Sequence, residues 1–193
     1  MGRRADDVAQ TRQRIIEAAV RLHGSIGPAQ TTVSALAAEA GVTRLTVYRH
    51  FPEADLLFAE CSRHWAAGQR MPDLDLWRKH AEPQERLRVG LSDLYRFYEE
   101  AQSMLALVLR DRDVVPEAQR RQREETEAAR RDVLLEPFRA RGRRRHRLQG
   151  VLGHALAFGT WSSLCVDNGL SRAEAVEAVA QMVLAVADRT GTA

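Results

Sequence analysis

Residues 32–51 constrain the fold of this chain more than any other segment, because they predict two short helices that meet at a glycine. Thr32 is placed to accept hydrogen bonds from the free amides at the start of a helix over Val33–Ala40. Gly41 ends that helix, since a residue without a β-carbon readily takes the left-handed conformation found just past a helix end. The helix buries a single apolar stripe, made up of Val33, Leu36, Ala37 and Ala40.

The second short helix has a narrow apolar side and a wide polar one. Thr43 is placed to cap it, and Val47 and Phe51 face inward because they lie four residues apart. The outward side is rich in groups that donate hydrogen bonds to phosphates and bases. Its residues are Arg44, Leu45, Thr46, Tyr48, Arg49 and His50.

The segments on either side complete a three-helix unit. Before it, an apolar face at the i, i+3, i+4, i+7 spacing predicts a helix that Gly24, Gly27 and Pro28 then break. After it, Pro52 is placed in the first turn of a further helix, which links this unit to the rest of the chain. The apolar face of the first helix consists of Ile15, Ala18, Ala19 and Leu22.

The run from Arg14 to Leu57 resembles the amino-terminal domain of the tetracycline-repressor (TetR) family of one-component transcription regulators. The features that carry this resemblance are the capping threonine, the AAEAGVT turn, the YRHF ending and the acidic-Leu pair that follows it. The resemblance implies an all-α fold, with an N-terminal three-helix helix-turn-helix DNA-binding domain and a C-terminal helical domain for ligand binding and dimerisation. It also implies a ligand-responsive regulator, usually a repressor, that binds a palindromic operator in double-stranded DNA as a homodimer and is released by a small-molecule effector.

Within this resemblance, Arg44, Leu45 and Thr46 are expected to meet base edges. The groups expected to hold phosphates are Thr32, Thr43, Tyr48, Arg49 and His50. Two residues depart from the family pattern. Ala54 stands where a phosphate-binding lysine is common, and Leu45 stands where a small residue or proline is frequent. A leucine at that place favours apolar contact with a thymine methyl group.

Charge and size agree with two domains, at 1–52 and 53–193. The formal net charge is +3, and residues 1–50 carry seven arginines against four acidic residues, so the rest of the chain is balanced. A basic amino-terminal region favours phosphate attraction, although a solvated helical surface would tolerate the same excess. Arg3 and Arg4 are expected on a disordered arm, which either enters the minor groove or only aids solubility.

The remainder of the chain reads as helices with short breaks and without strands. The expected helices cover residues 53–69, 83–100, 102–111, 117–141, 146–166 and 171–189. The last two are rich in small and apolar residues. In the resembled family they pair with their copies in a second subunit, and intramolecular core packing is the alternative. The residues expected at the dimer interface are Leu148, Leu152, Ala155, Gly159, Ala175, Val179, Met182, Val183 and Val186.

A ligand chamber is expected between the DNA-binding and pairing helices, and it would suit a hydrophobic or aromatic molecule. For each candidate, ordinary core packing is the alternative, because aromatic residues at helical spacing usually fill space. The candidates are Trp65, Tyr95, Tyr98, Met104, Leu107, Val108, Phe138, His154, Phe158 and Trp161. An arginine run follows Phe138 and is interpreted as a solvated loop or a site for an acidic partner. It contains Arg139, Arg141, Arg143, Arg144, Arg145 and Arg147.

No motif points to an enzyme or a cofactor. The chain has no P-loop, dinucleotide-binding glycine triplet, HExxH or GxSxG sequence, and Cys61 and Cys165 suggest neither a disulfide framework nor a metal site. An alternative function is a helical small-molecule binding protein or enzyme with a vestigial DNA-binding domain. The start of the chain lacks an apolar signal segment, and no stretch is long and apolar enough to span a bilayer. We therefore expect a cytoplasmic protein without a membrane partner.

Overall fold

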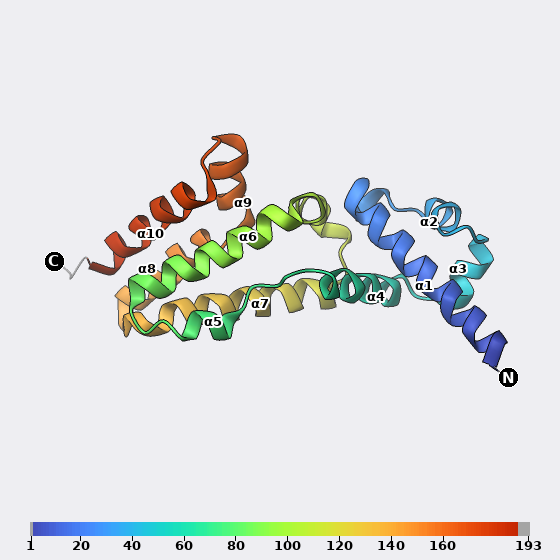
Figure 1. Cartoon of the computed structure of the whole chain (residues 1–193), viewed down its shortest axis with the longest axis horizontal. Coiled ribbons are helices and arrows are strands. Elements are labelled where there is room, and N and C mark those ends of the chain that lie inside the picture. The colour runs from blue at the N-terminus through green and yellow to red at the C-terminus, as the bar shows by residue number, and fades with distance from the viewer. Residues whose placement is uncertain (1, 189–193) are drawn as a thin grey trace. The chain divides into compact units, whose positions relative to one another are not determined.

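The computed structural model describes residues 2–188, and in that range it consists of helices joined by turns, without strands (Figure 1). This confirms the predicted all-α fold. The helices form two compact units. The first unit contains the chain up to residue 69 together with 101–121, and the second contains 70–100 together with the chain from 122 onward. The first unit therefore extends past residue 52, where the sequence suggested a boundary.

The first unit is organised around its long amino-terminal helix, which packs against the second and fourth helices. The helix begins at Gly2, so the arm predicted for Arg3 and Arg4 is helical backbone. Pro52 lies just before the cap of the fourth helix rather than in its first turn, because Glu53 is the capping residue. The helices are α1 (Gly2–Ser25), α2 (Val33–Ala40), α3 (Arg44–His50) and α4 (Ala54–Ala67), with a 3-10 turn at Pro28–Gln30.

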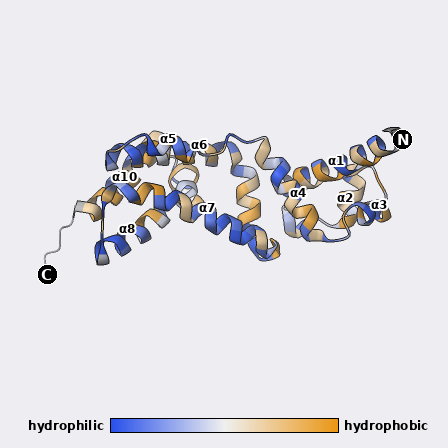
Figure 2. Cartoon of the chain, turned by 90° about the horizontal axis from the view of Figure 1, so that it is seen from below, coloured by the Kyte–Doolittle hydropathy of each residue, from blue (hydrophilic) through white to orange (hydrophobic). Residues whose placement is uncertain are grey.

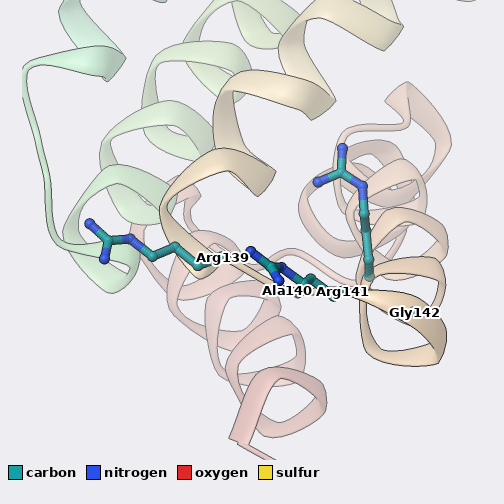
Figure 3. A pocket seen from close by; sticks show the side chains of 5 residues that line it. Arg139, Ala140, Arg141 and Gly142 are labelled. Carbon is teal, nitrogen blue, oxygen red and sulfur yellow. The ribbon is translucent and has the colours of Figure 1, made fainter.

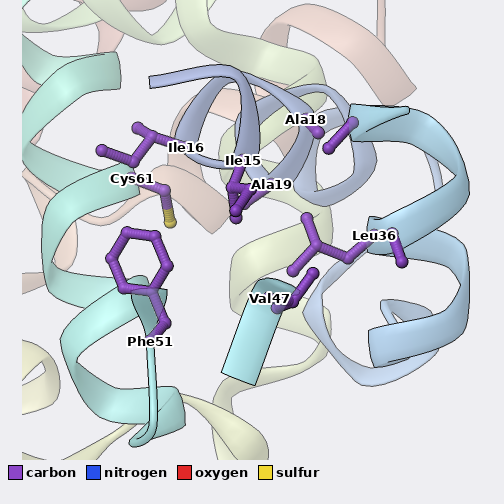
Figure 4. Packing of buried hydrophobic residues seen from close by; sticks show 10 residues of the cluster. Ile15, Ile16, Ala18, Ala19, Leu36, Val47, Phe51 and Cys61 are labelled. Atoms are coloured by element: carbon purple, nitrogen blue, oxygen red, sulfur yellow. The ribbon is translucent and has the colours of Figure 1, made fainter. Parts of the chain in front are cut away.

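The core of this unit is made of small and branched apolar side chains from all four helices (Figure 4). Val47 of α3 reaches it beside Leu36 of α2, and Phe51 reaches it beside Cys61 of α4. The sequence-predicted faces of α1, α2 and α3 are therefore the faces that pack. The buried cluster consists of Ile15, Ile16, Ala18, Ala19, Leu36, Ala37, Ala40, Val47, Phe51 and Cys61.

A later stretch of the chain completes the first unit through polar contacts. The Asp111 carboxylate accepts a hydrogen bond from the amide of Ala29 at 3.0 Å, and the Arg110 guanidinium donates to the carbonyl of Ile26 at 2.9 Å. Gly27 lies beside this pair with a φ of 92°. A β-carbon there would stand 2.4 Å from an Asp111 oxygen, so only glycine fits.

The second unit is built on two long helices, α6 and α7, each of which also contributes residues to the first unit. Hydrophilic residues cover most of α7 (Figure 2), which presents its buried residues near its carboxyl end. The helices are α5 (Leu74–Arg78), α6 (Pro83–Arg110), α7 (Glu117–Leu135), α8 (Gly142–Ala155), α9 (Phe158–Trp161) and α10 (Arg172–Asp188). Short turns cover Arg112–Val114 and Glu136–Phe138, and a π-helical segment covers Ser162–Asp167.

Several of the predicted helices differ from those in the structure. The two helices expected over 83–100 and 102–111 are the single helix α6, which passes through the buried Ala101. The helix expected over 117–141 ends at Leu135, because Pro137 lies in the turn that follows it. The short helix α5 was not predicted at all. Asp73 caps it by accepting hydrogen bonds from the amides of Asp75 and Leu76.

The helix expected over 146–166 is also wrong, since α8 ends at Ala155 and α9 begins at Phe158. Three hydroxyl groups donate hydrogen bonds to backbone carbonyls at this break. Tyr95 donates to the carbonyl of Ala155 at 2.9 Å, and Tyr98 donates to that of Leu156 at 2.6 Å. Thr160 donates to the carbonyl of His154 at 2.6 Å. These side-chain donors stabilise the break, because backbone carbonyls at a helix end need hydrogen-bond partners.

Candidate nucleic-acid interface and effector site

The turn between α2 and α3 is held by its own local hydrogen bonds. The Thr32 hydroxyl accepts from the amide of Ala35 at 3.1 Å, and the Thr43 hydroxyl accepts from that of Thr46 at 3.1 Å. Gly41 is left-handed, with a φ of 66°, and its amide donates to the end of α2. The predicted caps and the predicted glycine turn are thus confirmed.

The helix α3 has a buried side and an exposed side. Val47 and Phe51 are buried, whereas Leu45 is 79% exposed and Tyr48 is 54% exposed. Arg44 and Arg49 are also exposed, and neither forms an ion pair within residues 2–188. Two large apolar side chains and two unpaired cations on one short helix make a surface suited to a polyanion that also offers apolar groups.

The remaining candidates on this surface differ in availability. The hydroxyls of Thr43 and Thr46 lie 2.9 Å apart and hydrogen bond to each other, while Thr32 is exposed beside its cap. His50 is half-buried, and its Nε2 has no partner. Burial, together with Arg49 and Arg12, lowers the pKa of His50, so its ring is neutral at neutral pH. Proximity to a phosphate would raise that pKa again.

Arg12, on α1, is a positioning residue that the sequence did not reveal. Its guanidinium lies 4.6 Å from the centroid of the Phe51 ring and 3.2 Å from the Glu60 carboxylate. The cation and the ring fix the carboxyl end of α3 against α1 and α4. No pattern in the sequence marks this residue, because its partners lie far from it along the chain.

The predicted effector residues divide between the two units. The first unit holds Trp65, Met104, Leu107 and Val108, all half-buried. The second unit brings together Tyr95, Tyr98, Phe158 and Trp161, while Phe138 is buried at the end of α7 and His154 is exposed.

Tyr98 is the centre of this aromatic cluster. Its ring centroid lies 5.4 Å from that of Phe158 and 6.0 Å from that of Trp161, and Tyr95 stacks at 6.2 Å. Burial raises the pKa of Tyr98 to about 12, and it raises that of Tyr95 as well. Both hydroxyls therefore stay protonated, and each donates a hydrogen bond to a backbone carbonyl. The hydroxyls of Tyr95 and Tyr98, which the sequence analysis offered as effector contacts, thus stabilise the fold.

Three other buried polar groups in the second unit were not recognised in the sequence. Trp161 is 2% exposed, and its indole N–H has no acceptor within residues 2–188. Arg130 is 8% exposed, and its guanidinium carbon lies 5.9 Å from the centroid of the Phe97 ring. Arg130 forms no hydrogen bond or ion pair with the described residues, whereas the equally buried Arg86 has four acceptors. Burial lowers the pKa of Arg130.

The surface expected to pair with a second copy is partly internal. Most of its residues are buried by the packing of α8 on α10 within one chain, namely Leu148, Leu152, Ala155, Ala175, Val179 and Val183. Gly159 and Met182 are exposed and Val186 is half-buried. Met182 lies on α10 between the exposed Ala178 and Ala185, one turn away on either side. An exposed apolar stripe therefore remains on α10.

The arginine run surrounds an open hollow of about 550 Å³ lined by Arg139, Arg141 and Arg145 (Figure 3). Figure 3 shows the Arg139 side chain extending away from Arg141, so these two guanidinium groups do not converge on one point. Arg143, Arg144 and Arg145 lie on the helix α8 rather than in the predicted loop, and Arg147 lies on α8 within the helix predicted over 146–166. Within residues 2–188, no group of three or more His, Cys, Asp or Glu side chains is placed to hold a metal ion. No helix in this range has the length and apolar character needed to cross a membrane.

Comparison with known proteins places the first unit among DNA-binding domains. Residues 15–61 match the model of the bacterial regulatory proteins of the tetR family. A segment of 61 residues is 41% identical to the HTH-type transcriptional regulator AcrR of Shigella flexneri. The segment makes up 31% of this chain and 28% of that relative, so most of the relative's length is unmatched.

Solved structures of similar fold cover nearly the whole chain. A TetR-like transcriptional regulator from Rhodococcus sp. RHA1 has a TM-score of 0.61 at 16% identity, covering 90% of this chain and 93% of its own. A second TetR transcriptional regulator from the same organism has a TM-score of 0.51 at 18% identity, covering 95% and 99%. The TetR family transcriptional regulator PfmR from Thermus thermophilus has a TM-score of 0.55 at 21% identity, covering 94% and 98%. At these identities the likeness concerns the fold.

Proposed function

This chain belongs to the tetR family of bacterial regulatory proteins, and from that premise we propose that it is a ligand-responsive repressor that acts in the cytoplasm. Two copies bind a palindromic or nearly palindromic site in double-stranded DNA. A small hydrophobic or aromatic effector, bound in the helical body, releases them from it.

The exposed side of α3 carries this proposal. Arg44, Leu45 and Thr46 occupy the first turn of α3, the part of a recognition helix that meets base edges in the major groove. Arg44 supplies a fork of donors suited to guanine, and Leu45 supplies an apolar group for a thymine methyl. The phosphate contacts are assigned to Thr32, Thr43, Tyr48, Arg49 and His50, which fix the register of the helix on the duplex.

Dimerisation is assigned to α8 and α10. With most of the predicted interface residues packed inside one chain, the exposed stripe around Met182 is the part of α10 free to meet its copy. A two-fold axis through that stripe makes the interface self-complementary and presents two α3 helices to one DNA site. The operator is then expected to contain two half-sites about one helical turn apart.

Release by the effector follows from linkage between two sites. Only three residues separate α3 from α4, so a displacement of α4 is transmitted directly to the recognition helix. An effector that binds more tightly to the conformation with displaced α4 helices lowers the affinity for DNA. By the same coupling, DNA lowers the affinity for the effector.

The decisive experiment measures binding to the duplex upstream of the protein's own gene, by fluorescence anisotropy against an unrelated duplex of equal length. Arg44→Ala should weaken binding to the cognate duplex by about 1–3 kcal/mol and leave binding to the unrelated duplex nearly unchanged. Equal loss on both duplexes would reassign Arg44 to the DNA backbone. Wild-type protein that does not distinguish the two duplexes would contradict the proposed function.

A further inference from the structure

The second unit buries an arginine, Arg130, whose guanidinium has no hydrogen bond or ion pair within residues 2–188. Arg130 lies on the buried side of α7, and its guanidinium carbon is 5.9 Å from the centroid of the Phe97 ring. The carboxylates of Glu127 and Asp93 are near enough to act on its charge, but neither forms an ion pair with it within residues 2–188. A buried guanidinium has five donors and requires acceptors, and a buried charge without them is strongly unfavourable.

Arg86 is a second buried arginine of this unit, and its guanidinium donates hydrogen bonds to four acceptors. Its guanidinium donates to the carbonyls of His80 at 2.7 Å and Val133 at 3.2 Å, and to the Glu136 carboxylate at 2.8 Å. A further bond runs to the carbonyl of Arg78 at 3.3 Å. Because one buried arginine is saturated and the other is not, burial alone does not explain Arg130.

A second unpaired donor lies in the same aromatic cluster. The Trp161 ring is in contact range of Tyr98, and Arg130 is close enough to Tyr98 to affect the pKa of its hydroxyl. The Tyr98 hydroxyl donates to the carbonyl of Leu156. Within residues 2–188, its oxygen accepts no hydrogen bond from Arg130 or Trp161. Around Tyr98, then, the described part of the chain leaves two side-chain groups, the Arg130 guanidinium and the Trp161 indole N–H, without a hydrogen-bond acceptor.

We propose that the effector is an apolar molecule bearing a single carboxylate group, and that Arg130 binds the carboxylate. This inference rests on the proposed function, and it narrows the effector class from hydrophobic or aromatic molecules to hydrophobic acids. A carboxylate matches the guanidinium fork with two parallel hydrogen bonds. One cation calls for a monoanion, and the indole N–H of Trp161 offers one further neutral donor. The apolar part of the effector would meet the neighbouring aromatic cluster of Tyr98, Phe158 and Trp161.

The test uses two pairs of probes that differ only in the acid group: octanoate against 1-octanol, and 4-phenylbutyrate against 4-phenylbutanol. Affinities are measured on the full-length protein by calorimetry. For at least one pair, the acid should bind more than tenfold more tightly than the alcohol. Arg130→Met should abolish the preference. Arg143→Met, which removes the same charge from an exposed, unpaired position of the second unit, should retain it.

Several outcomes would overturn the proposal. One is that the wild-type protein binds the acid no more tightly than the alcohol in either pair. Another is that the Arg130→Met variant still prefers the acid. If Arg130→Met instead weakens dimerisation and leaves the preference unchanged, Arg130 contacts the second subunit. Should the methionine variant not fold, Arg130→Lys keeps the charge but loses the planar fork, and it should reduce the preference without abolishing it. An unchanged preference in the lysine variant counts against bidentate binding.

A parallel measurement separates this inference from the proposed function. The same probes are added to the protein bound to its upstream duplex. Acids that bind through Arg130 but release no DNA would leave the carboxylate site in place and contradict the regulatory mechanism. Specific DNA binding by a protein without any preference for acids would contradict only the carboxylate site.

Discussion

The two units of this protein bury polar groups in different ways. The core cluster of the first is apolar apart from Cys61, whose thiol sulfur lies 3.5 Å from Nδ1 of the buried His23. The one carboxylate buried in the described part of this unit is Asp111. The second unit buries two arginines and the hydroxyls of Tyr95, Tyr98 and Thr160. The difference teaches that the first unit is held mainly by packing and helix caps, with long-range polar contacts such as that of Asp111 at its Ile26–Ala29 bend. The second unit depends more on matching buried donors to acceptors over long sequence distances.

The largest effect should come from replacing the saturated arginine of the second unit. Arg86→Met leaves the carbonyls of Arg78, His80 and Val133 without their donor, which should lower the free energy of unfolding by roughly 3–5 kcal/mol. Arg130→Met removes no hydrogen bond and should leave the stability of the free protein equal or higher. Chemical denaturation of both variants, followed by tryptophan fluorescence, checks this contrast. Equal destabilisation by the two substitutions would mean that Arg130 also has acceptors.

Acid should act on the first unit through His23. Burial lowers the pKa of His23 from 6.5 to about 4, so between these values the unfolded chain binds a proton that the folded unit does not. The folded state therefore loses stability as the pH falls through this window, by about 3 kcal/mol in total. Denaturation midpoints at pH 4 to 7 measure the slope.

His23→Gln should flatten that slope. His64→Gln removes an exposed histidine from the same unit and should preserve it. A wild-type slope in the His23 variant would assign the acid sensitivity to other groups and weaken the contrast between the units.

The smallest effect should come from a helix cap of the first unit. Thr43→Ala removes the hydroxyl that accepts from the amide of Thr46, which should cost about 1 kcal/mol of stability. Thr43→Ser retains the acceptor and should stay close to wild type. Thermal unfolding compares the two, and alanine and serine variants of equal stability would show that the cap does not stabilise α3.

The contrast between the units also explains what the sequence could predict. Thr32, Gly41 and Thr43 act on neighbours within four residues, so the bounds of α2 and α3 could be predicted from local pattern. The break after α8 could not, because its carbonyls are taken by Tyr95 and Tyr98 from about 60 positions away. The helical pattern of residues 146–166 contains no glycine or proline signal at Leu156 or Ala157 that would mark it.

The candidate sites, too, could be predicted where the contacts are local in sequence and not where they are distant. The outward side of α3 was read from residue spacing, since Val47 and Phe51 alone determine which side is left exposed. The effector residues were chosen as large or polarisable side chains, and this criterion selected Tyr95 and Tyr98, whose hydroxyls are used by the backbone. It passed over Arg130, because a charged residue on a largely polar helix is expected at the surface.

The contact of Asp111 with Ala29 has a practical consequence for anyone building hybrid regulators. The first unit is not a contiguous stretch of sequence, since Arg110 and Asp111 return to it from the end of α6. A fragment cut at residue 52 or 69 would lack the groups that hold the Ile26–Ala29 bend. Grafting this DNA-binding specificity onto a foreign sensor domain therefore requires that the 101–121 segment be transplanted with it.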